Sequence, residues 1–389
     1  MRCWRPKSGR DATPPLLFAT TRRRATGGSA ISRACRPRLR RCASGNAEKS
    51  GRPISRGLRI VMHVKFSFIM AGICLLFGSS AFGAEPSFGW PAACSLGMDC
   101  WIAQYVDHDP SASFRDFTCG HQTYDKHDGI DIALKDRNAM NGGVHVVAAA
   151  DGRVVRMRDG MDDHYGTPKD IAAVKAAKKE GGNIVSLLHD DGWVTEYGHM
   201  KKGSVTVKDG QYVRKGDVLG AVGQSGMAQF AHVHFSVRHK NKTVDPFAGE
   251  AFSGCGGEVK PMWEKPAAYE PIVLFAAGFS DAEPDLGKLA LDASSPPSLP
   301  VGAEKLLFWF VFYGAEPGDR LNLSILDPMG EAYAQNEFRQ ERRQARVYRM
   351  IGQRTAGAPL KAGTYTGRAT VTRKGLAVRE IEQTVIIRE

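Results

Sequence analysis

Two short segments of the sequence carry side chains that bind metal ions. The first reads His127-Asp128-Gly129-Ile130-Asp131, and the second, farther along the chain, reads His232-Val233-His234. Apolar and polar residues alternate in both segments, which predicts strands with the histidines and Asp131 on one face. Zinc prefers imidazole nitrogens and carboxylate oxygens, and a catalytic zinc keeps one position open for water. We therefore expect His127, Asp131 and His234 to be the protein ligands of one zinc ion.

Two further histidines could move protons at such a centre. His232 lies two residues before His234, on the same face of the predicted strand. His199, in the segment Tyr197-Gly198-His199, lies on another predicted strand. Zinc lowers the pKa of a bound water from about 15.7 toward neutrality, so that one histidine could accept the proton of the attacking water and the other donate to the tetrahedral intermediate. The alternative is a structural zinc site, which a fourth protein ligand would normally close.

Residues 120–255 are predicted to form a small antiparallel β domain. Turn pairs such as Asp151-Gly152 and Asp191-Gly192 separate short β-like runs. These runs are Val144–Ala150, Ile184–Leu188, Val194–Tyr197, Val218–Val222 and Val233–Val237. The segment Pro168–Lys179 has a helical period and predicts a short helix inside an insertion at about 159–182. Residues 85–119, an irregular segment with Gly, Pro and two close cysteines, are interpreted as an N-terminal strap.

A second β domain is predicted at residues 271–389, after a linker at 256–270 that contains glycine and proline. The run Lys305–Tyr313 is apolar on both faces, as in an inner strand. Three later segments alternate more cleanly, namely Arg320–Leu326, Gly363–Arg373 and Ile381–Arg388. Several short strands separated by turns predict a β-sandwich. This domain contains no cluster of His, Cys or paired carboxylates, so we interpret it as an accessory module that could bind a protein partner.

The net charge of +12 is concentrated at the N-terminus. Residues 1–61 contain 16 Lys and Arg against two acidic residues, which leaves a charge of −2 for the remaining chain. This distribution does not predict a nucleic-acid partner. The first 61 residues show no apolar period, so we expect a disordered or misassigned N-terminal extension. The alternative is a basic arm for anionic partners.

Residues 62–84 are organised like a secretory signal peptide. The basic stretch Met62–Lys65 is followed by an apolar run to about Gly78 and by small residues, with cleavage expected between Ala81 and Ala84. The run is too short to cross a bilayer comfortably. We therefore expect translation to start at Met62, and export to the periplasm or the extracellular space without a stable membrane anchor. An uncleaved anchor is the alternative.

Four cysteines follow the signal peptide: Cys94, Cys100, Cys119 and Cys255. An even number in an oxidising compartment predicts two disulfides, with three possible pairings. We expect Cys94–Cys100 and Cys119–Cys255, the second of which would tie together the ends of the histidine-rich region. A Cys₄ zinc site would need close C-x-x-C pairs, and the sequence contains none.

Together, the H-x-x-x-D, Y-x-H and H-x-H motifs resemble the lysostaphin/LytM-type zinc metallopeptidases. Three connecting segments also resemble the family, namely Val144–Gly152, Val207–Gly220 and Val244–Pro246. The resemblance covers residues 120–250. It implies a small antiparallel β fold with zinc in a groove, and endopeptidase cleavage of the peptide cross-links in bacterial peptidoglycan. The family's zinc ligands map onto His127, Asp131 and His234, and its catalytic histidines onto His199 and His232.

The sequence departs mildly from the family pattern. Ala231 and Val233 stand where Gly and Leu are common, which changes the groove wall but removes no chemistry. Some members of the family have lost their ligands and activate other wall hydrolases; the five site residues here argue against that reading, although not against a dual role. The hairpin Val207–Gly220 also resembles biotinyl- or lipoyl-carrier domains, but it has no lysine flanked by Met at a tight turn.

Overall fold

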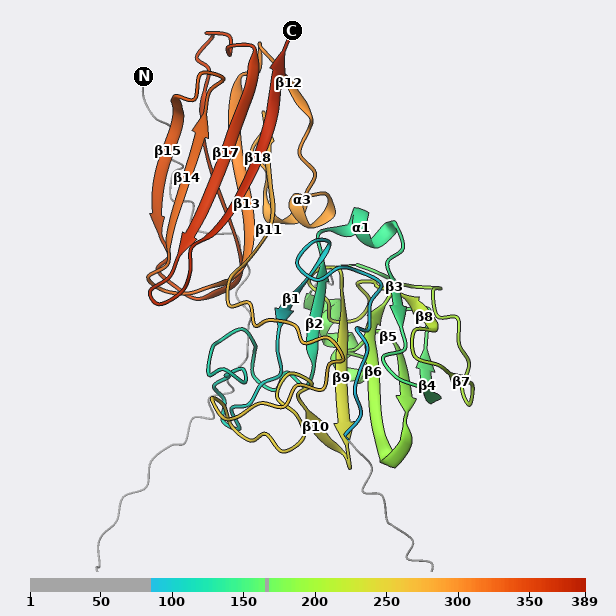
Figure 1. The fold of residues 1–389 in the computed structure, drawn as a ribbon. Coiled ribbons are helices and arrows are strands. Elements are labelled where there is room, and N and C mark those ends of the chain that lie inside the picture. The colour runs from blue at the N-terminus through green and yellow to red at the C-terminus, as the bar shows by residue number, and fades with distance from the viewer. Residues whose placement is uncertain (1–84, 165–167) are drawn as a thin grey trace, which may run out of the picture. The chain divides into compact units, whose positions relative to one another are not determined.

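The structure is built mainly from antiparallel strands, as the alternating sequence predicts (Figure 1). This computed structural model describes residues 85–164 and 168–389, so the expected N-terminal extension and signal peptide lie outside the described residues. The described helices are short: α1 (Arg137–Asn141), α2 (Pro168–Ala176) and α3 (Leu286–Leu291), with one 3₁₀ turn at Asp190–Gly192. Helix α2 lies where the insertion predicts one.

One eight-stranded sheet carries Asp131, His232 and His234 on its strands, whereas His127 lies in the loop before Ile130 and not in a strand, although the alternation had predicted one there. Its strands follow the order β1-β2-β9-β6-β5-β4-β7, and β10 also pairs with β9. Their bounds are β1 (Cys100–Gln104), β2 (Ile130–Leu134), β4 (Gly152–Arg158), β5 (Asn183–Leu188), β6 (Trp193–Met200), β7 (Tyr212–Val213), β9 (His232–His239) and β10 (Lys242–Val244). A separate two-stranded sheet joins β3 (His145–Val147) to β8 (Val218–Ala221). The five β-like runs of this region thus contain or overlap observed strands.

The alternation in β2 and β9 separates a core face from a site face. Ile130, Ile132, Val233, Phe235 and Val237 are fully buried in one apolar cluster. Because successive side chains of a strand point to opposite faces, His232 and His234 of β9 lie on the other face. Burial of these large side chains, each worth roughly 1.5–3 kcal/mol, anchors the strands that carry the site.

Residues 273–388 contain two further sheets that enclose a second core. One has the order β11-β13-β16 and the other the order β12-β18-β17-β14-β15. Their bounds are β11 (Val273–Ser280), β12 (Ser298–Pro300), β13 (Lys305–Ala315), β14 (Arg320–Leu326), β15 (Ala332–Arg339), β16 (Gln344–Arg354), β17 (Gly363–Thr372) and β18 (Arg379–Arg388). Phe308, Phe310 and Phe312 point into the core between the sheets. The predicted apolar inner strand is therefore β13, which is buried on both faces.

Four strands of this region, β11, β12, β15 and β16, were not expected from the sequence. β15 reads AYAQNEFR and has mostly exposed side chains, because it is the edge strand of its sheet. Edge strands carry polar residues that discourage pairing with other chains, and this weakens their alternation. β16 has mostly half-buried side chains over 11 positions with no clean alternation, and it pairs along its whole length with β13.

The two expected disulfides are both present. Cys94 is bonded to Cys100, and Cys119 is bonded to Cys255 across 136 positions of the chain. The second bond encloses the whole segment that carries His127, Asp131, His199, His232 and His234. A cross-link stabilises a fold mainly by restricting the unfolded chain, and the restriction grows with the length of the closed loop.

We predict that the double substitution Cys119→Ser and Cys255→Ser lowers the free energy of unfolding by about 2–5 kcal/mol. The matched double substitution Cys94→Ser and Cys100→Ser should cost less, because its loop spans only six positions. Urea titrations of both variants under oxidising conditions measure the difference. A smaller loss for the long loop than for the short one would contradict the loop-length argument.

Candidate metal centre

The register of β2 and β9 brings the predicted ligands together. Asp131 pairs with His234, and Ala133 pairs with His232. On the other side of β9, His234 pairs with Gly198 of β6. Paired residues in an antiparallel sheet share a face, so Asp131, His232 and His234 project from the same face. A side chain at Gly129 would collide with the His234 ring, because an added Cβ would lie 2.5 Å from its Nε2.

Three ligating atoms meet at one point. His127 Nε2 lies 3.2 Å from Asp131 Oδ1 and 3.2 Å from His234 Nδ1, and His234 Nδ1 lies 2.9 Å from Asp131 Oδ1. A tetrahedral zinc with bonds of about 2.0–2.1 Å separates its ligand atoms by about 3.3 Å. The observed separations are close to that value, so the three residues fit a zinc ion. Neither His127 nor Asp131 is more than 4% exposed.

The hydrogen bonds behind the two ligand histidines fix which nitrogen faces the cluster. His127 Nδ1 lies 2.6 Å from the carbonyl oxygen of Tyr105, which can only accept, so Nδ1 donates and Nε2 keeps its lone pair. His234 Nε2 lies 3.3 Å from Asp128 Oδ1, which leaves Nδ1 facing Asp131. Such outer partners orient ligand histidines and raise their basicity in metal sites.

The two histidines predicted to transfer protons lie beside this cluster. Their ring centroids are 4.5 Å apart, and His232 Nε2 is 3.5 Å from Asp131 Oδ1. His199 Nδ1 donates to the carbonyl oxygen of Ser225 at 2.7 Å, and His232 Nδ1 donates to that of Phe230 at 2.9 Å. In both rings Nε2 is therefore left free of a backbone partner. The structure brings all five predicted site residues into one group.

His199 reaches the cluster through an unusual backbone conformation. Its φ is +57°, in the left-handed region that costs a non-glycine residue energy. The backbone is held there because His199 N donates to Gly181 O at 2.7 Å. Gly181 ends the insertion at 159–182, so the insertion helps to position His199. The sequence predicts a short helix in this insertion but does not indicate its contact with His199.

The buried charges of the cluster shift its pKa values. Burial alone would raise the pKa of Asp131, but the adjacent His127 and His232 rings bring it well below its usual range, so the carboxylate is ionised. Burial lowers the pKa of His234, yet its hydrogen bonds to Asp128 and Asp131 outweigh burial and raise the pKa to about 10. Without a metal, the cluster therefore takes up positive charge as a proton on His234.

His199 behaves in the opposite way. Burial, together with the neighbouring His232 and His234 rings, lowers the pKa of His199 to about 3. Its ring is therefore neutral at physiological pH. A neutral imidazole whose Nδ1 is already engaged can accept a proton only at Nε2.

Three contributing residues were missed in the sequence. The backbone carbonyl of Tyr105 orients His127, and a contact with a backbone atom leaves no pattern of side chains in the sequence. Asp128 stands next to His127 in the motif and pairs with both His234 and Arg238, so its acidic type beside a ligand was an available signal. Tyr124 stacks on the His127 ring at 4.3 Å with an interplanar angle of 29°, and nothing in its spacing indicates this.

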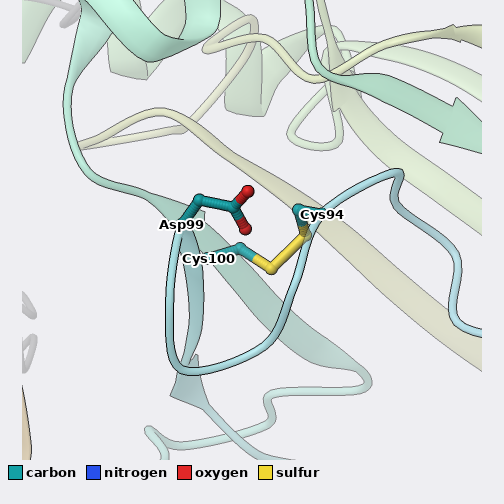
Figure 2. Close-up of side chains that lie close together, drawn as sticks. All are labelled: Cys94, Asp99 and Cys100. Carbon is teal, nitrogen blue, oxygen red and sulfur yellow. A yellow bond between two sulfur atoms is a disulfide. The ribbon is translucent and has the colours of Figure 1, made fainter.

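A second group of ligating residue types does not form a metal site. Cys94, Asp99 and Cys100 lie close together, as Figure 2 shows, but the two cysteines are joined in a disulfide. Their sulfur atoms are therefore not thiolates. Asp99 Oδ1 accepts a hydrogen bond from Ser95 N at 2.6 Å, which closes the turn between the cysteines.

Comparisons with known proteins identify the same part of the chain. Residues 125–246 match peptidase family M23. Cell division protein DipM of Caulobacter vibrioides is 33% identical over 121 residues, which is 30% of this chain and 18% of DipM. Murein hydrolase activator NlpD of Escherichia coli K12 is 27% identical over 118 residues, which is 30% of this chain and 24% of NlpD. The chain thus spans a quarter or less of these relatives.

Solved structures give weaker similarities. The catalytic domain of the antimicrobial peptidase lysostaphin from Staphylococcus simulans is 22% identical, with a TM-score of 0.24, over 37% of this chain and 85% of that chain. The segment matched by the family contains all five residues of the candidate metal centre. Residues 125–246 of this chain are a domain of peptidase family M23.

Proposed function

We propose that this protein is an exported zinc metalloendopeptidase that hydrolyses peptide bonds in peptidoglycan cross-links. His127, Asp131 and His234 would hold one zinc ion per chain. The observation that carries the proposal is the orientation of the four histidines. Each has one nitrogen occupied by an oxygen acceptor behind it, and the other nitrogen is turned toward the group around Asp131. A site with three ligands and two spare histidines is open, as a catalytic site must be.

The proposed chemistry divides the work among these residues. Zinc, when bound, supplies a positive charge that polarises a carbonyl group and lowers the pKa of water. His199 Nε2 would accept a proton from the attacking water, because its ring is neutral and its Nδ1 is held by Ser225. His232 Nε2 faces the same space and would donate a hydrogen bond to the developing oxyanion.

The sheet beside the centre supports an extended substrate. An open groove of about 400 Å³ lies over β4, β5, β6 and β9 and includes Ser236 and Arg238. These two residues continue the face of β9 that carries His234. A peptide lying along this face would place one of its bonds at the cluster, as an endopeptidase requires.

Export is part of the proposal. The residues around 62–84 would be removed as a signal peptide, and the two disulfides suit the periplasm or another oxidising compartment. Within the described residues, no helix has the length and apolar character that a membrane span requires. Peptidoglycan stem peptides are the proposed substrate, with the C-terminal sandwich as a possible contact for a protein partner.

A second candidate function is the activation of other cell-wall hydrolases. Relatives named murein hydrolase activator NlpD favour it, because they match the same part of the chain. A regulator of this kind would have little activity of its own and would act by binding. The two functions differ in whether the purified protein, without any partner, releases new peptide ends from peptidoglycan.

We predict one zinc per chain in the mature protein and loss of that zinc in Asp131→Ala. The carboxylate supplies one of three ligand atoms and the negative charge of the site, so its removal should also abolish the release of peptide ends. Metal analysis and incubation with purified peptidoglycan measure both properties, with the exposed Asp209→Ala as the matched control. Zinc retained in Asp131→Ala would remove this ligand from the assignment, whereas bound zinc without any cleavage would favour the activator.

We also predict that His199→Ala and His232→Ala keep their zinc but lower kcat/KM by about 10²–10⁴-fold, the usual effect of losing a proton-transfer group. Neither residue is needed to complete the three-ligand set, so zinc content serves as the internal control. Full activity in both variants would be incompatible with the roles assigned to these histidines.

A further inference from the structure

A third apolar cluster, separate from the core between the two sandwich sheets, joins the sandwich to the face of the sheet that carries the candidate metal centre. The described residues group in one compact unit, and a single buried cluster contains residues from both the metal-binding sheet and the sandwich. Trp101, Ala103 and Ala133 of β1 and β2 pack there with sandwich residues that include Phe275, Val311 and Tyr313. Because β1, β2 and β9 are paired, with Trp101 opposite Ala133 and Ala133 opposite His232, this cluster lies on the same face as His232.

A line of aromatic rings connects the sandwich to His232. The Phe230 ring lies 4.7 Å from the His232 ring and 5.7 Å from the Tyr313 ring. Tyr313 is stacked on Phe275 at 4.5 Å, and Phe275 contacts Trp101 at 5.7 Å. Tyr313 is almost fully buried, and burial, with a contribution from the charge of Asp131, raises the pKa of its hydroxyl to about 12. The backbone oxygen of Phe230 also holds His232 Nδ1.

A second connection reaches His127. Arg343, which precedes β16, donates hydrogen bonds to the carbonyl oxygens of His121 and Thr123, and its guanidinium lies over the Phe114 ring at 4.5 Å. Tyr124, which directly follows Thr123, stacks on the His127 ring. The sandwich therefore fixes the segment that supports one face of a ligand histidine.

We propose that the C-terminal sandwich is a positioning part of the active site, in which Tyr313, acting through Phe230, sets the position of the His232 ring. This inference rests on the proposed peptidase function, since it explains how one of its proton-transfer groups is held. Tyr313 is a positioning residue, because it touches neither the ligand atoms nor the expected position of the substrate. Small displacements of a catalytic group can cost up to about 100-fold in rate.

The test compares Tyr313→Leu, Phe230→Leu and their double variant in the full mature protein. We expect kcat to fall about ten- to a hundredfold in each, with KM within twofold and zinc affinity unchanged. The double variant should be no worse than the single ones, because Tyr313 acts through Phe230. Tyr313→Phe keeps the ring and should keep the activity. The matched control is Tyr365→Leu, which removes an equally buried ring from the sandwich core away from the centre.

A second readout does not depend on hydrolysis. In zinc-loaded protein with ¹³C-labelled histidine, the His232 ring resonance should shift in Tyr313→Leu and Phe230→Leu but not in Tyr365→Leu. An unmoved resonance, additive losses in the double variant, or an equal loss in Tyr365→Leu would each overturn the proposal. If the wild-type protein cleaves no peptidoglycan, the proposed function fails, and the resonance of His232 still decides the positioning role.

Discussion

The antiparallel pairing of β2 with β9 is the constraint on which the rest of the structure depends. It places Asp131 opposite His234 and leaves His232 one pair farther along the same face. A slip of one residue would turn the whole histidine face of β9 into the core and bring Val233 and Phe235 to the site. The apolar residues of the core face, all fully buried, make such a slip very costly. The same packing that stabilises the domain therefore sets the geometry of the cluster.

Much of this arrangement could be predicted because strand alternation is a local property. The period of two in Ile130–Leu134 and His232–His239 predicted which side chains share a face, and the residue types predicted what they could bind. The apolar run in β13 likewise predicted an inner strand. These inferences need only neighbouring residues in the sequence, and the described strands agree with them.

The parts that escaped prediction depend on contacts between distant segments or on backbone atoms. The Tyr105 carbonyl behind His127, the Gly181 oxygen that holds His199, and the Phe230 carbonyl behind His232 have no side-chain signature. The edge strand β15 was missed because its exposure removes the apolar alternation that would reveal it. No sequence pattern within the sandwich indicates that Tyr313 packs against Phe230, because this contact joins positions that are 83 residues apart.

Placing four histidines and a carboxylate in a nearly dry site opposes stability. Burying a charge costs free energy unless it is paired, and burying a polar atom costs free energy unless it is hydrogen-bonded. One nitrogen of each histidine ring lies against an oxygen partner on the side away from the cluster. The lone pairs that remain unsatisfied are concentrated at the centre of the cluster. Proteins commonly accept such local instability where a ligand later relieves it. The aromatic contacts of the sandwich reach this cluster through Phe230, whose ring lies beside the His232 ring.

The contacts of the sandwich with the candidate site involve residues that are synthesised late. All five residues of the metal centre, and both cysteines of the Cys119–Cys255 bond, precede residue 256, whereas Tyr313 and Arg343 follow it. Synthesis from the N-terminus therefore produces the five candidate site residues and both cysteines of this disulfide before it produces Tyr313 and Arg343. During synthesis, the residues of the candidate metal centre are made first, and the residues that complete the surroundings of His232 and His127 are made last. The site residues would thus be present in the growing chain before the sandwich residues that complete their surroundings.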